Sequence, residues 1–510
     1  MRVLDSLVDE KLLPDLAQRV PYTFIKKHLV LPIEEHEDNI VVAVADPLNI
    51  NAIDELRLML DKEIKTVFAP QAAILHAINI CYHQKEGTTS QFIANLSEES
   101  EKESSAEAES EVYDLLETTD SEAPIIRLLN LILSEAIQQG ASDVHFEPSD
   151  EDLKIRYRID GVLLPRHFPS PEYKNQLLTR IKVLARLDIA EHRLPQDGRI
   201  KLSMGGREID FRVSTVPSLH GERIVLRILD KGNFVVGLDK LGMLPSTLDE
   251  FRRLISLSEG IVLVTGPTGS GKTTTLYSAL WEIFNEEINV MTIEDPVECK
   301  MKGVGQIAVH PKIGLNFATG LRHILRQDPD VVMIGEIRDQ ETAEIAIQAA
   351  LTGHLVLSTL HTNDAPSAIP RLIDMNVEPY LLSSTIVGVL AQRLVRKVCS
   401  HCRERYIPQD EELEELGLIR ERLNGGVLYR GKGCEHCFGS GYKGRHGLYE
   451  LLTIDACLQS TIAKEANSHQ IRKIAMERGL ITLRRHGAHL VRGGITTTQE
   501  VLRVSRKYEG

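Results

Sequence analysis

The sequence predicts a multidomain α/β protein whose largest part is a parallel β-sheet with helices on both faces. The chain has 510 residues, more than a single hydrophobic core usually serves, so several domains are expected. From residue 260 onward, short apolar runs that end in polar residues alternate with helical segments: GIVLVTG, KTTTLYSALWEIF, INVMTIED, DVVMIGE and HLVLSTLH. This alternation is typical of a RecA-like core, which we assign to residues 236–395. Ligands of such sheets collect where the strands end.

The composition is that of a globular protein, with 42% hydrophobic and 26% charged residues. The formal net charge of -14 disfavours binding to a nucleic-acid backbone, which requires a basic face, so no nucleic-acid partner is expected. No run approaches the roughly eighteen apolar residues of a membrane span. Acidic residues also interrupt the short apolar run in MRVLDSLVDEKLLPD. We therefore expect a cytoplasmic protein with neither a signal peptide nor a span.

The beginning of the chain, residues 1–85, is predicted to be a small α/β domain that docks on a partner protein. It mixes strand-like and helical patterns such as NIVVAVADPLN and DELRLMLDKEI. Residues 86–122 are rich in Ser and Glu and poor in large apolar side chains, so they cannot bury enough surface to offset the entropy of ordering. They are predicted to be a flexible acidic linker, and the alternative is a segment that folds on a partner.

Residues 123–235 are predicted to form a helix followed by a half-buried antiparallel sheet. The helix opens at Pro124 and ends at Gly140, which has the position of a glycine C-cap. In LKIRYRIDG, apolar and basic residues alternate with a period of two, and Asp160-Gly161 is a hairpin signal. The runs REIDFRVS and ERIVLRIL repeat the alternation, so the outer face of the sheet is expected to be rich in arginine.

The most specific motif is a phosphate-binding loop. Residues 266–273 fit GxxxxGK(S/T) and lie between a predicted strand and a predicted helix, which is the context that gives this motif its meaning. Backbone N–H groups and the helix N-terminus converge on phosphate oxygens, Lys272 supplies a cation for the β- and γ-phosphates, and the Thr273 hydroxyl is placed for Mg²⁺. ATP hydrolysis with ATP and Mg²⁺ as ligands is therefore predicted. The residues expected to contact the nucleotide here are Gly266, Pro267, Thr268, Gly269, Ser270, Gly271, Lys272, Thr273 and Thr274.

Acidic residues follow two of the predicted strands. Glu336 comes after the strand 331–334 and resembles a Walker B acid, which could bind Mg²⁺ through water or polarise the attacking water. Glu294 and Glu298 lie at and beyond the end of another strand, and Glu294 is expected at the nucleotide. Either Glu298 or Glu336 is the general base, and Glu336 is favoured. His361, at the end of LVLSTL, could sense the γ-phosphate.

Four of the seven cysteines form two CxxC pairs, CSHC and CEHC, on either side of the helical stretch DEELEELGLIRERL. Four thiolates close the tetrahedral shell of a structural Zn²⁺. Redox dithiols are the alternative, but two matched pairs in a chain without an export signal favour metal. Residues 396–445 are therefore predicted to be a zinc-binding subdomain, followed by a C-terminal helical region at 446–510. The expected ligands are Cys399, Cys402, Cys434 and Cys437.

Taken together, these motifs resemble the secretion and type IV pilus assembly ATPase family, GspE/PulE/PilB. The resemblance runs from about residue 123 to the C-terminus. It rests on the P-loop, the acidic segment 294–298, Glu336, the histidine segment 352–361 and the tetracysteine insert. The segment LLSSTIVGVLAQRLVRKVC and the short N-terminal domain favour the type II secretion branch over the pilus branch.

The resemblance implies a homo-hexamer that holds ATP between the RecA-like domain and a PAS-like sheet domain. Hydrolysis would power type II secretion by driving pseudopilus assembly at the inner membrane. The implied partners are a GspL-like cytoplasmic domain and a GspF-like platform protein, which would place the chain peripherally on the cytoplasmic face of that membrane.

The resemblance also implies that arginines approach the nucleotide. Arg212 and Arg227 match the family pattern, and a solvated sheet face accounts for them equally well. Lys443 stands where the family often has arginine, and lysine cannot form the same bidentate contact. Further candidates are Arg322, Arg326 and Arg338.

Three other functions are considered. A type IV pilus assembly ATPase differs in the machine that it drives. A RecA-like nucleic-acid translocase would need a basic channel, which the acidic balance disfavours. A non-hydrolysing scaffold is disfavoured because Lys272, Thr273, Glu298 and Glu336 occur together.

Overall fold

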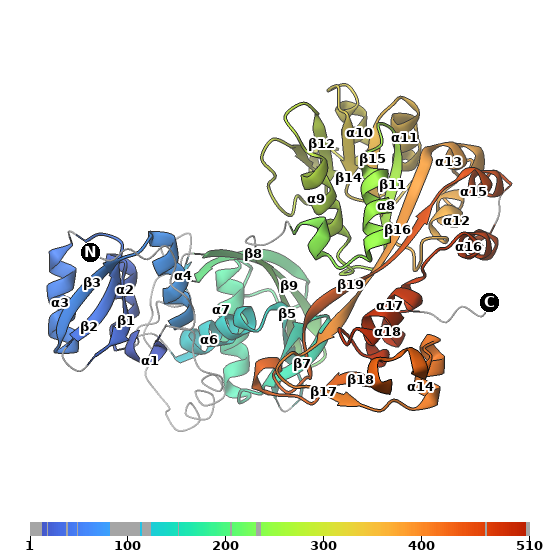
Figure 1. Ribbon diagram of the computed structural model, residues 1–510. Coiled ribbons are helices and arrows are strands. Elements are labelled where there is room, and N and C mark those ends of the chain that lie inside the picture. Colours follow the sequence, from blue (N-terminus) through green and yellow to red (C-terminus); the bar gives the residue numbers. More distant parts are fainter. Residues whose placement is uncertain are drawn as a thin grey trace. The chain divides into compact units, whose positions relative to one another are not determined.

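The computed structural model divides the chain into two compact units, Met1–Gly232 and Asn233–Gly510 (Figure 1). The linker expected at 86–122 lies outside the described residues, apart from the two-residue strand β4 at Tyr113–Asp114. The described residues are 13–17, 19–36, 39–47, 49–81, 113–114, 124–150, 152–204, 207–230, 236–464 and 467–505.

The beginning of the first unit is a small α/β fold, as the sequence predicts. Its sheet has the order β1-β2-β3, with β2 antiparallel to β1 and parallel to β3. Parallel neighbours need a crossover connection, and helix α3 provides it. The elements are α1 (Pro14–Ala17), α2 (Tyr22–His28), β1 (Val30–Glu35), β2 (Asn39–Val44), α3 (Ile50–Leu60), β3 (Glu63–Phe68) and α4 (Gln71–Cys81).

The rest of the first unit is a sheet of order β4-β8-β9-β10-β5-β6-β7, antiparallel except for the β4–β8 pair. The predicted period of two is confirmed, because Leu153, Ile155 and Tyr157 of one strand are fully buried. The predicted hairpin is also confirmed, since Asp160 and Gly161 both have positive φ and join two paired strands. The elements are α6 (Pro124–Gln138), β5 (Ala141–Pro148), β6 (Leu153–Ile159), β7 (Val162–His167), α7 (Glu172–Leu184), β8 (Gln196–Met204), β9 (Arg207–Ser218) and β10 (Gly221–Asp230).

The second unit is built on a sheet of order β13-β12-β14-β15-β11-β16-β19, parallel except for β19. Both faces are covered, because Ile261 and Leu263 of β11 belong to one core cluster while Val262 and Val264 belong to another. The predicted RecA-like alternation is thereby confirmed. The strands are β11 (Gly260–Thr265), β12 (Val290–Glu294), β13 (Gly305–Ala308), β14 (Val331–Ile334), β15 (Leu355–Leu360), β16 (Ile386–Val398) and β19 (Tyr442–Thr453).

Helices on both faces cover this sheet. Helices α8 and α9 contribute to one core cluster, and α10, α11, α12 and α13 contribute to the other. Their bounds are α8 (Pro245–Ile255), α9 (Lys272–Ile283), α10 (Phe317–Ile324), α11 (Gln340–Leu351), α12 (Ala368–Ile373) and α13 (Pro379–Thr385).

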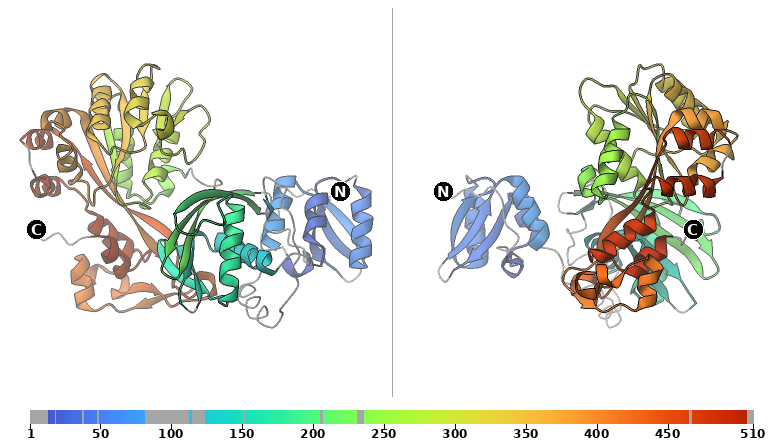
Figure 2. Two further views of the ribbon diagram at one scale, coloured as in Figure 1. Left: turned by 180° about the vertical axis from the view of Figure 1, so that it is seen from behind. Right: turned by 45° about the vertical axis from the view of Figure 1, so that its right-hand side comes forward.

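The expectation that residues 446–510 form a helical region is wrong at its start. Residues 446–453 belong to β19, which pairs antiparallel with β16 from Val398↔Tyr442 to Gly388↔Thr453 (Figure 2). Residues 448–450 are all buried. This part of the strand therefore lacks the alternation of buried and exposed residues that identifies a half-exposed strand. Between the two strands lie β17 (Arg403–Tyr406), α14 (Asp410–Leu416) and β18 (Leu428–Gly431). After them come α15 (Ala456–Ile462), α16 (Ser468–Glu477), α17 (Leu483–Arg492) and α18 (Thr498–Val504).

Among the described residues, none of the helices combines the length and apolar character that crossing a membrane requires.

Candidate functional site

The phosphate-binding loop connects strand β11 to helix α9, which begins at Lys272. Two of its glycines are required by their surroundings. Gly266 has φ 152°, and a Cβ there would lie 2.5 Å from the carbonyl oxygen of Gln392. Gly271 has φ 90°, and a Cβ there would lie 2.8 Å from Nε2 of Gln392. The loop is therefore packed against strand β16, and both positions favour glycine because larger residues rarely adopt these φ values.

Lys272 is enclosed by its own loop. Its Nζ atom donates to the carbonyl oxygens of Gly266 at 2.8 Å and Pro267 at 3.2 Å. Burial lowers the pKa of Lys272 to about 8, Glu336 opposes this shift, and the charge of Arg393 adds to it. An ion or ligand oxygen near Lys272 would replace neutral carbonyl acceptors with charged ones, which stabilises the ammonium.

The other loop residues leave room for a ligand. Thr268, Gly269 and Thr273 are exposed, while Thr274 is partly buried and its carbonyl oxygen accepts a bond from Ser278. The Oγ atom of Ser270 is buried and has no hydrogen-bond partner among the described residues. An unpaired buried hydroxyl beside the N-terminus of helix α9 suits an anionic ligand.

Glu336 follows strand β14 and lies within the electrostatic range of Lys272. Its carboxylate pairs with Arg338, and its Oε2 atom is 3.3 Å from Nε2 of His361. Burial alone would raise the pKa of Glu336, but Arg338 and then His361 hold it below its ordinary value. The group is therefore ionised at neutral pH. A hydroxyl at Thr273 and this carboxylate are oxygen donors of the kind that Mg²⁺ prefers.

Glu294, which is predicted to contact the nucleotide, is buried at the end of strand β12. Its buried carboxylate accepts hydrogen bonds from the Tyr277 hydroxyl at 2.5 Å, Thr292 Oγ1 at 2.6 Å and Gln306 Nε2 at 3.2 Å. The backbone N–H of Cys299 also donates to the Tyr277 hydroxyl, at 3.3 Å. Because these donors occupy the carboxylate, Glu294 holds the end of strand β12 against helix α9.

Glu298 lies in the loop that this network anchors. It is partly buried, and its side chain makes no hydrogen bond or ion pair with any residue that the structure describes. The structure thus leaves its carboxylate available, while Glu336 is the acid whose charge acts on Lys272.

The two histidines beside strand β15 differ in their surroundings. His361 is half exposed and touches Glu336. His354 instead bonds through Nδ1 to the Ala349 carbonyl oxygen at 2.8 Å and lies 3.1 Å from Thr352 Oγ1. His354 therefore stabilises the end of helix α11, and only His361 lies at the candidate site.

Arg212 and Arg227 belong to the first unit, where they are direct cross-strand partners on β9 and β10. Arg199 on β8 is the partner of Arg212 on its other side, so three arginines form one row across the sheet. The Nε atom of Arg227 is 2.9 Å from the buried Asp143. Like charges directly opposite each other repel, so the row is suited to an anion. Of the further candidates, Arg322 pairs with Glu341, Arg326 is exposed and Arg338 pairs with Glu336.

The four predicted zinc ligands converge. Their sulfur atoms all lie within 4.8 Å of one another, and three of the separations fit a common centre: Cys399–Cys434 at 3.8 Å, Cys402–Cys437 at 3.8 Å and Cys434–Cys437 at 3.7 Å. Sulfurs bound at about 2.3 Å to a tetrahedral ion lie about 3.8 Å apart. Backbone N–H groups of Gly433, Cys434 and Gly441 donate to two of these sulfurs at 3.2–3.3 Å. The cluster can therefore hold a metal ion.

The residues between the two cysteines of each CxxC pair are exposed. The exposed rings of His401 and His436 contact each other in a tilted arrangement with centroids 4.0 Å apart, and neither belongs to the group of metal-ligating side chains. Lys443 is exposed on strand β19.

Parts of the site are held by three residues that no sequence motif indicates: Tyr277, Gln392 and Arg393. Gln392 accepts a 2.7 Å hydrogen bond from Thr275 of helix α9 and packs on the loop glycines. None of the three stands in a motif, and only the adjacency of β16 to β11 brings two of them to the loop.

Comparison with known proteins decides the family. A model of the type II/IV secretion system protein family matches residues 118–503, and a model of the MshEN domain matches residues 5–88. The chain belongs to the type II/IV secretion system protein family. This secretion ATPase is 46% identical over 494 residues to "Type II secretion system ATPase E" of Vibrio cholerae serotype O1, covering 96% of this chain and 97% of that protein. It is 42% identical over 499 residues to "Type IV pilus assembly ATPase PilB" of Myxococcus xanthus, covering 98% and 88%.

Among solved structures, the ATPase DotB of Legionella pneumophila has the same fold, with a TM-score of 0.55 and 21% identity. The match covers 78% of this secretion ATPase and 99% of DotB. The family and the ATPase class that the sequence predicts are thus confirmed.

Proposed function

We propose that this secretion ATPase hydrolyses ATP at the loop 266–273 and that hydrolysis powers type II secretion by driving pseudopilus assembly at the inner membrane. The observation that carries the catalytic part is that Lys272 and Glu336 follow the carboxyl ends of β11 and β14, two parallel strands of one sheet. Lys272 holds the terminal phosphates, because its ammonium gains charged acceptors when ATP replaces the loop carbonyls.

Glu336 serves as the general base in this proposal. Arg338 and His361 keep its carboxylate ionised and oriented, so it can accept a proton from the attacking water. Mg²⁺, held by Thr273 and by Glu336 directly or through water, would neutralise charge on the phosphates. Glu298 is the alternative base, because its side chain is uncommitted.

The catalytic proposal is tested by Lys272→Ala and Glu336→Gln in the full-length protein. Lys272→Ala should lower kcat by about 10² or more, since a preorganised charge is removed from the transition state. Glu336→Gln should bind ATP and hydrolyse it poorly. The matched control is Lys302→Ala, an exposed lysine outside the loop. Near wild-type turnover in either site variant would refute the assignment.

The machine that the ATPase drives is proposed from its relatives, which include type II secretion and type IV pilus assembly ATPases. Pilus assembly is therefore the second candidate. Expression in a strain that lacks its type II secretion ATPase, and separately in one that lacks its pilus assembly ATPase, tests the choice. Rescue of secretion alone supports the proposal, and rescue of piliation alone supports the second candidate.

The assembly is proposed to be a homo-hexamer with Arg212 and Arg227 contributing to ATP sites. The part of the chain before residue 86 would dock on a GspL-like cytoplasmic domain, and the motor would act on a GspF-like platform protein at the cytoplasmic face of the inner membrane. Removal of residues 1–110 should leave ATP hydrolysis intact and abolish recruitment to membranes that carry these proteins. Recruitment of the truncated protein would refute the docking role.

The tetracysteine cluster is proposed to hold a structural Zn²⁺. Four soft ligands with no open position suit a site that stabilises the fold rather than one that binds substrate. A nucleic-acid translocase is not favoured, and ATPase activity that is unchanged by single-stranded DNA would support its exclusion.

A further inference from the structure

The loop from His361 to Ala365 joins strand β15 to helix α12, and each of its five residues is held by a different part of the second unit. The contacts, in chain order, are His361 to Glu336 after β14, Thr362 to Thr265 of β11, Asn363 to Arg393 of β16, Asp364 to Arg472 of α16, and Ala365 to Glu450 of β19. Contacts at every residue of the loop constrain the backbone from which the His361 side chain extends.

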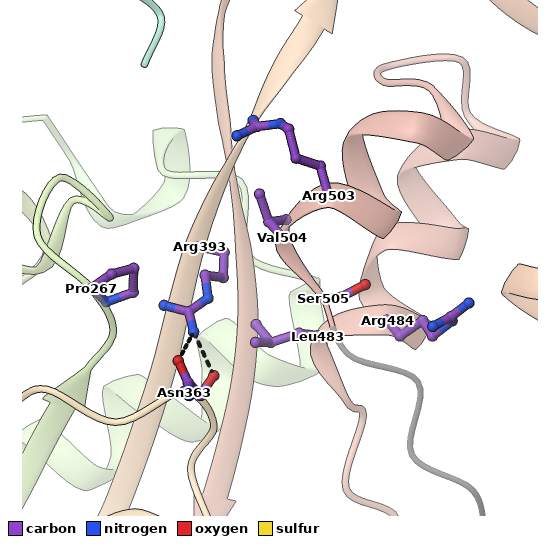
Figure 3. A pocket seen from close by; sticks show the side chains of 8 residues that line it. All are labelled: Pro267, Asn363, Arg393, Leu483, Arg484, Arg503, Val504 and Ser505. Carbon is purple, nitrogen blue, oxygen red and sulfur yellow. Dashed lines mark hydrogen bonds between the residues drawn. The ribbon is translucent and has the colours of Figure 1, made fainter. Parts of the chain in front are cut away.

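Arg393 holds the centre of this loop. One of its terminal nitrogens donates to the Asn363 carbonyl oxygen at 3.0 Å and to Asn363 Oδ1 at 2.9 Å (Figure 3). Only 9% of Arg393 is exposed, whereas Asn363 is exposed, so the guanidinium is the buried partner of these part-buried bonds. Figure 3 shows its side chain reaching Asn363 from strand β16, in a cavity of about 310 Å³ that Pro267 also lines.

Strand β16 thereby contacts two parts of the proposed ATP site, the phosphate-binding loop and the loop that carries His361. Gln392 bonds to Thr275 of helix α9 and packs on the glycines of the phosphate-binding loop. The next residue, Arg393, reaches the loop that carries His361. Two consecutive residues of one strand thus fix the position of the phosphate-binding loop relative to the loop that carries His361.

The far end of the loop is held by two buried carboxyl groups. Asp364 is 2.9 Å from Arg472, and Glu450 accepts the N–H groups of Ala365 at 2.9 Å and Leu483 at 3.1 Å. Both carboxyl groups are almost fully buried. Movement of the loop would therefore leave them buried without their hydrogen-bond partners, which costs free energy. The loop therefore has little freedom at this end. Nearer to His361, Thr265 holds Thr362 and Arg393 holds Asn363.

We propose that Arg393 is a positioning residue for ATP hydrolysis, acting through Asn363 to hold His361 against Glu336. This inference rests on the proposed function of Glu336. His361 is half exposed and its described contact with the site is the one to Glu336, so its position depends on the backbone that carries it. Catalytic geometry tolerates little error, and a displacement of about 1 Å can cost about 10²-fold in rate.

The test compares Arg393→Met, which keeps much of the side-chain volume without the donors, with Arg393→Lys, which keeps a donor. Arg393→Met should lower kcat between about tenfold and 10²-fold with little change in KM for ATP, and Arg393→Lys should recover part of the loss. The matched control is Arg371→Gln. Arg371 is exposed on helix α12, directly after the loop, and its side chain has no ion pair or hydrogen bond with a described residue.

A double-mutant cycle separates positioning from a general loss of packing. If Arg393 acts through His361, Arg393→Met should slow a His361→Ala protein by less than about twofold. Additive losses, wild-type turnover of His361→Ala, or an effect of Arg393→Met confined to KM would each overturn the inference.

Amide hydrogen exchange of the full chain tests the same inference without hydrolysis, so its result is separable from failure of the proposed function. Arg393→Met should accelerate exchange in residues 361–365, and Arg371→Gln should not. Unchanged exchange in this loop would overturn the positioning role whether or not the protein turns over ATP.

Discussion

The Nζ atom of Lys272 donates a 2.8 Å hydrogen bond to the carbonyl oxygen of Gly266, in the loop that it is proposed to use for phosphate. The ammonium is therefore paired with neutral acceptors, and burial lowers its pKa to about 8. The bound phosphates would favour the protonated form, so ATP binding should raise this pKa.

The first prediction follows from this expected rise in the pKa of Lys272 on ATP binding. As pH rises through about 8, free protein loses the Lys272 proton, and ATP binding must then take up a proton. The apparent affinity for ATP should fall between pH 7.5 and 9 by up to about tenfold per pH unit above the pKa of the free protein. Calorimetric titration in buffers of different ionisation enthalpy measures the uptake directly. Proton uptake that is equally small at pH 7 and pH 9 would contradict the prediction.

The second prediction concerns Tyr277, whose hydroxyl donates to Glu294 and accepts from the backbone of Cys299. Tyr277→Phe leaves a buried carboxylate without one donor and a backbone N–H without its acceptor. The free energy of unfolding should fall by about 1–3 kcal/mol. Because the same hydroxyl anchors the loop that leads to Glu298, kcat should fall as well. Chemical denaturation and steady-state kinetics measure the two effects. Tyr380→Phe is the control, since Tyr380 is exposed, and equal stability of the two variants would contradict the role of the network.

The third prediction concerns the metal. Elemental analysis of protein purified without chelator should give one Zn²⁺ per chain, and Cys399→Ser or Cys434→Ser should lose it and lower the thermal stability of the insert. Cys457→Ser should retain the metal, because Cys457 is exposed and outside the cluster. ATP binding should survive in every variant, since the cluster and the phosphate-binding loop occupy different segments. Four freely titratable thiols in metal-free wild-type protein would contradict the zinc site.

The fourth prediction concerns the arginine row of the first unit. Arg227→Ala should lower turnover of assembled protein by about 10³-fold if the guanidinium neutralises the transition state, and Arg227→Lys should rescue poorly because it lacks the planar fork. Asp143→Asn should have a smaller effect, because it removes only the partner that orients Arg227. Specific activity of the wild type should also rise with protein concentration as hexamers form. Turnover per subunit that stays constant while sizing shows hexamer formation would contradict this role.

The sequence determined the features that are local in the chain. The phosphate-binding loop, the two CxxC pairs and the Asp160-Gly161 hairpin each lie within a few residues, so short-range backbone geometry and ligand chemistry identify them. The parallel sheet was predicted on the same local basis. The runs of β11, β14 and β15 are continuously apolar, which is the pattern of a strand buried on both faces.

Only the tertiary structure decided how these segments meet. In the sheet, β11 lies between β15 and β16, strands that follow it by about 90 and 120 residues, because crossover connections set a spatial order that differs from chain order. That order brings Gln392 and Arg393 to the site, and the fold pairs the buried Glu294 with Tyr277 of helix α9. Residues 446–453 also became a strand through pairing with β16. Burial on both faces removes the alternation of apolar and polar residues that marks a strand. The strand conformation of this segment is therefore identified by its pairing with β16, more than forty residues away in the chain.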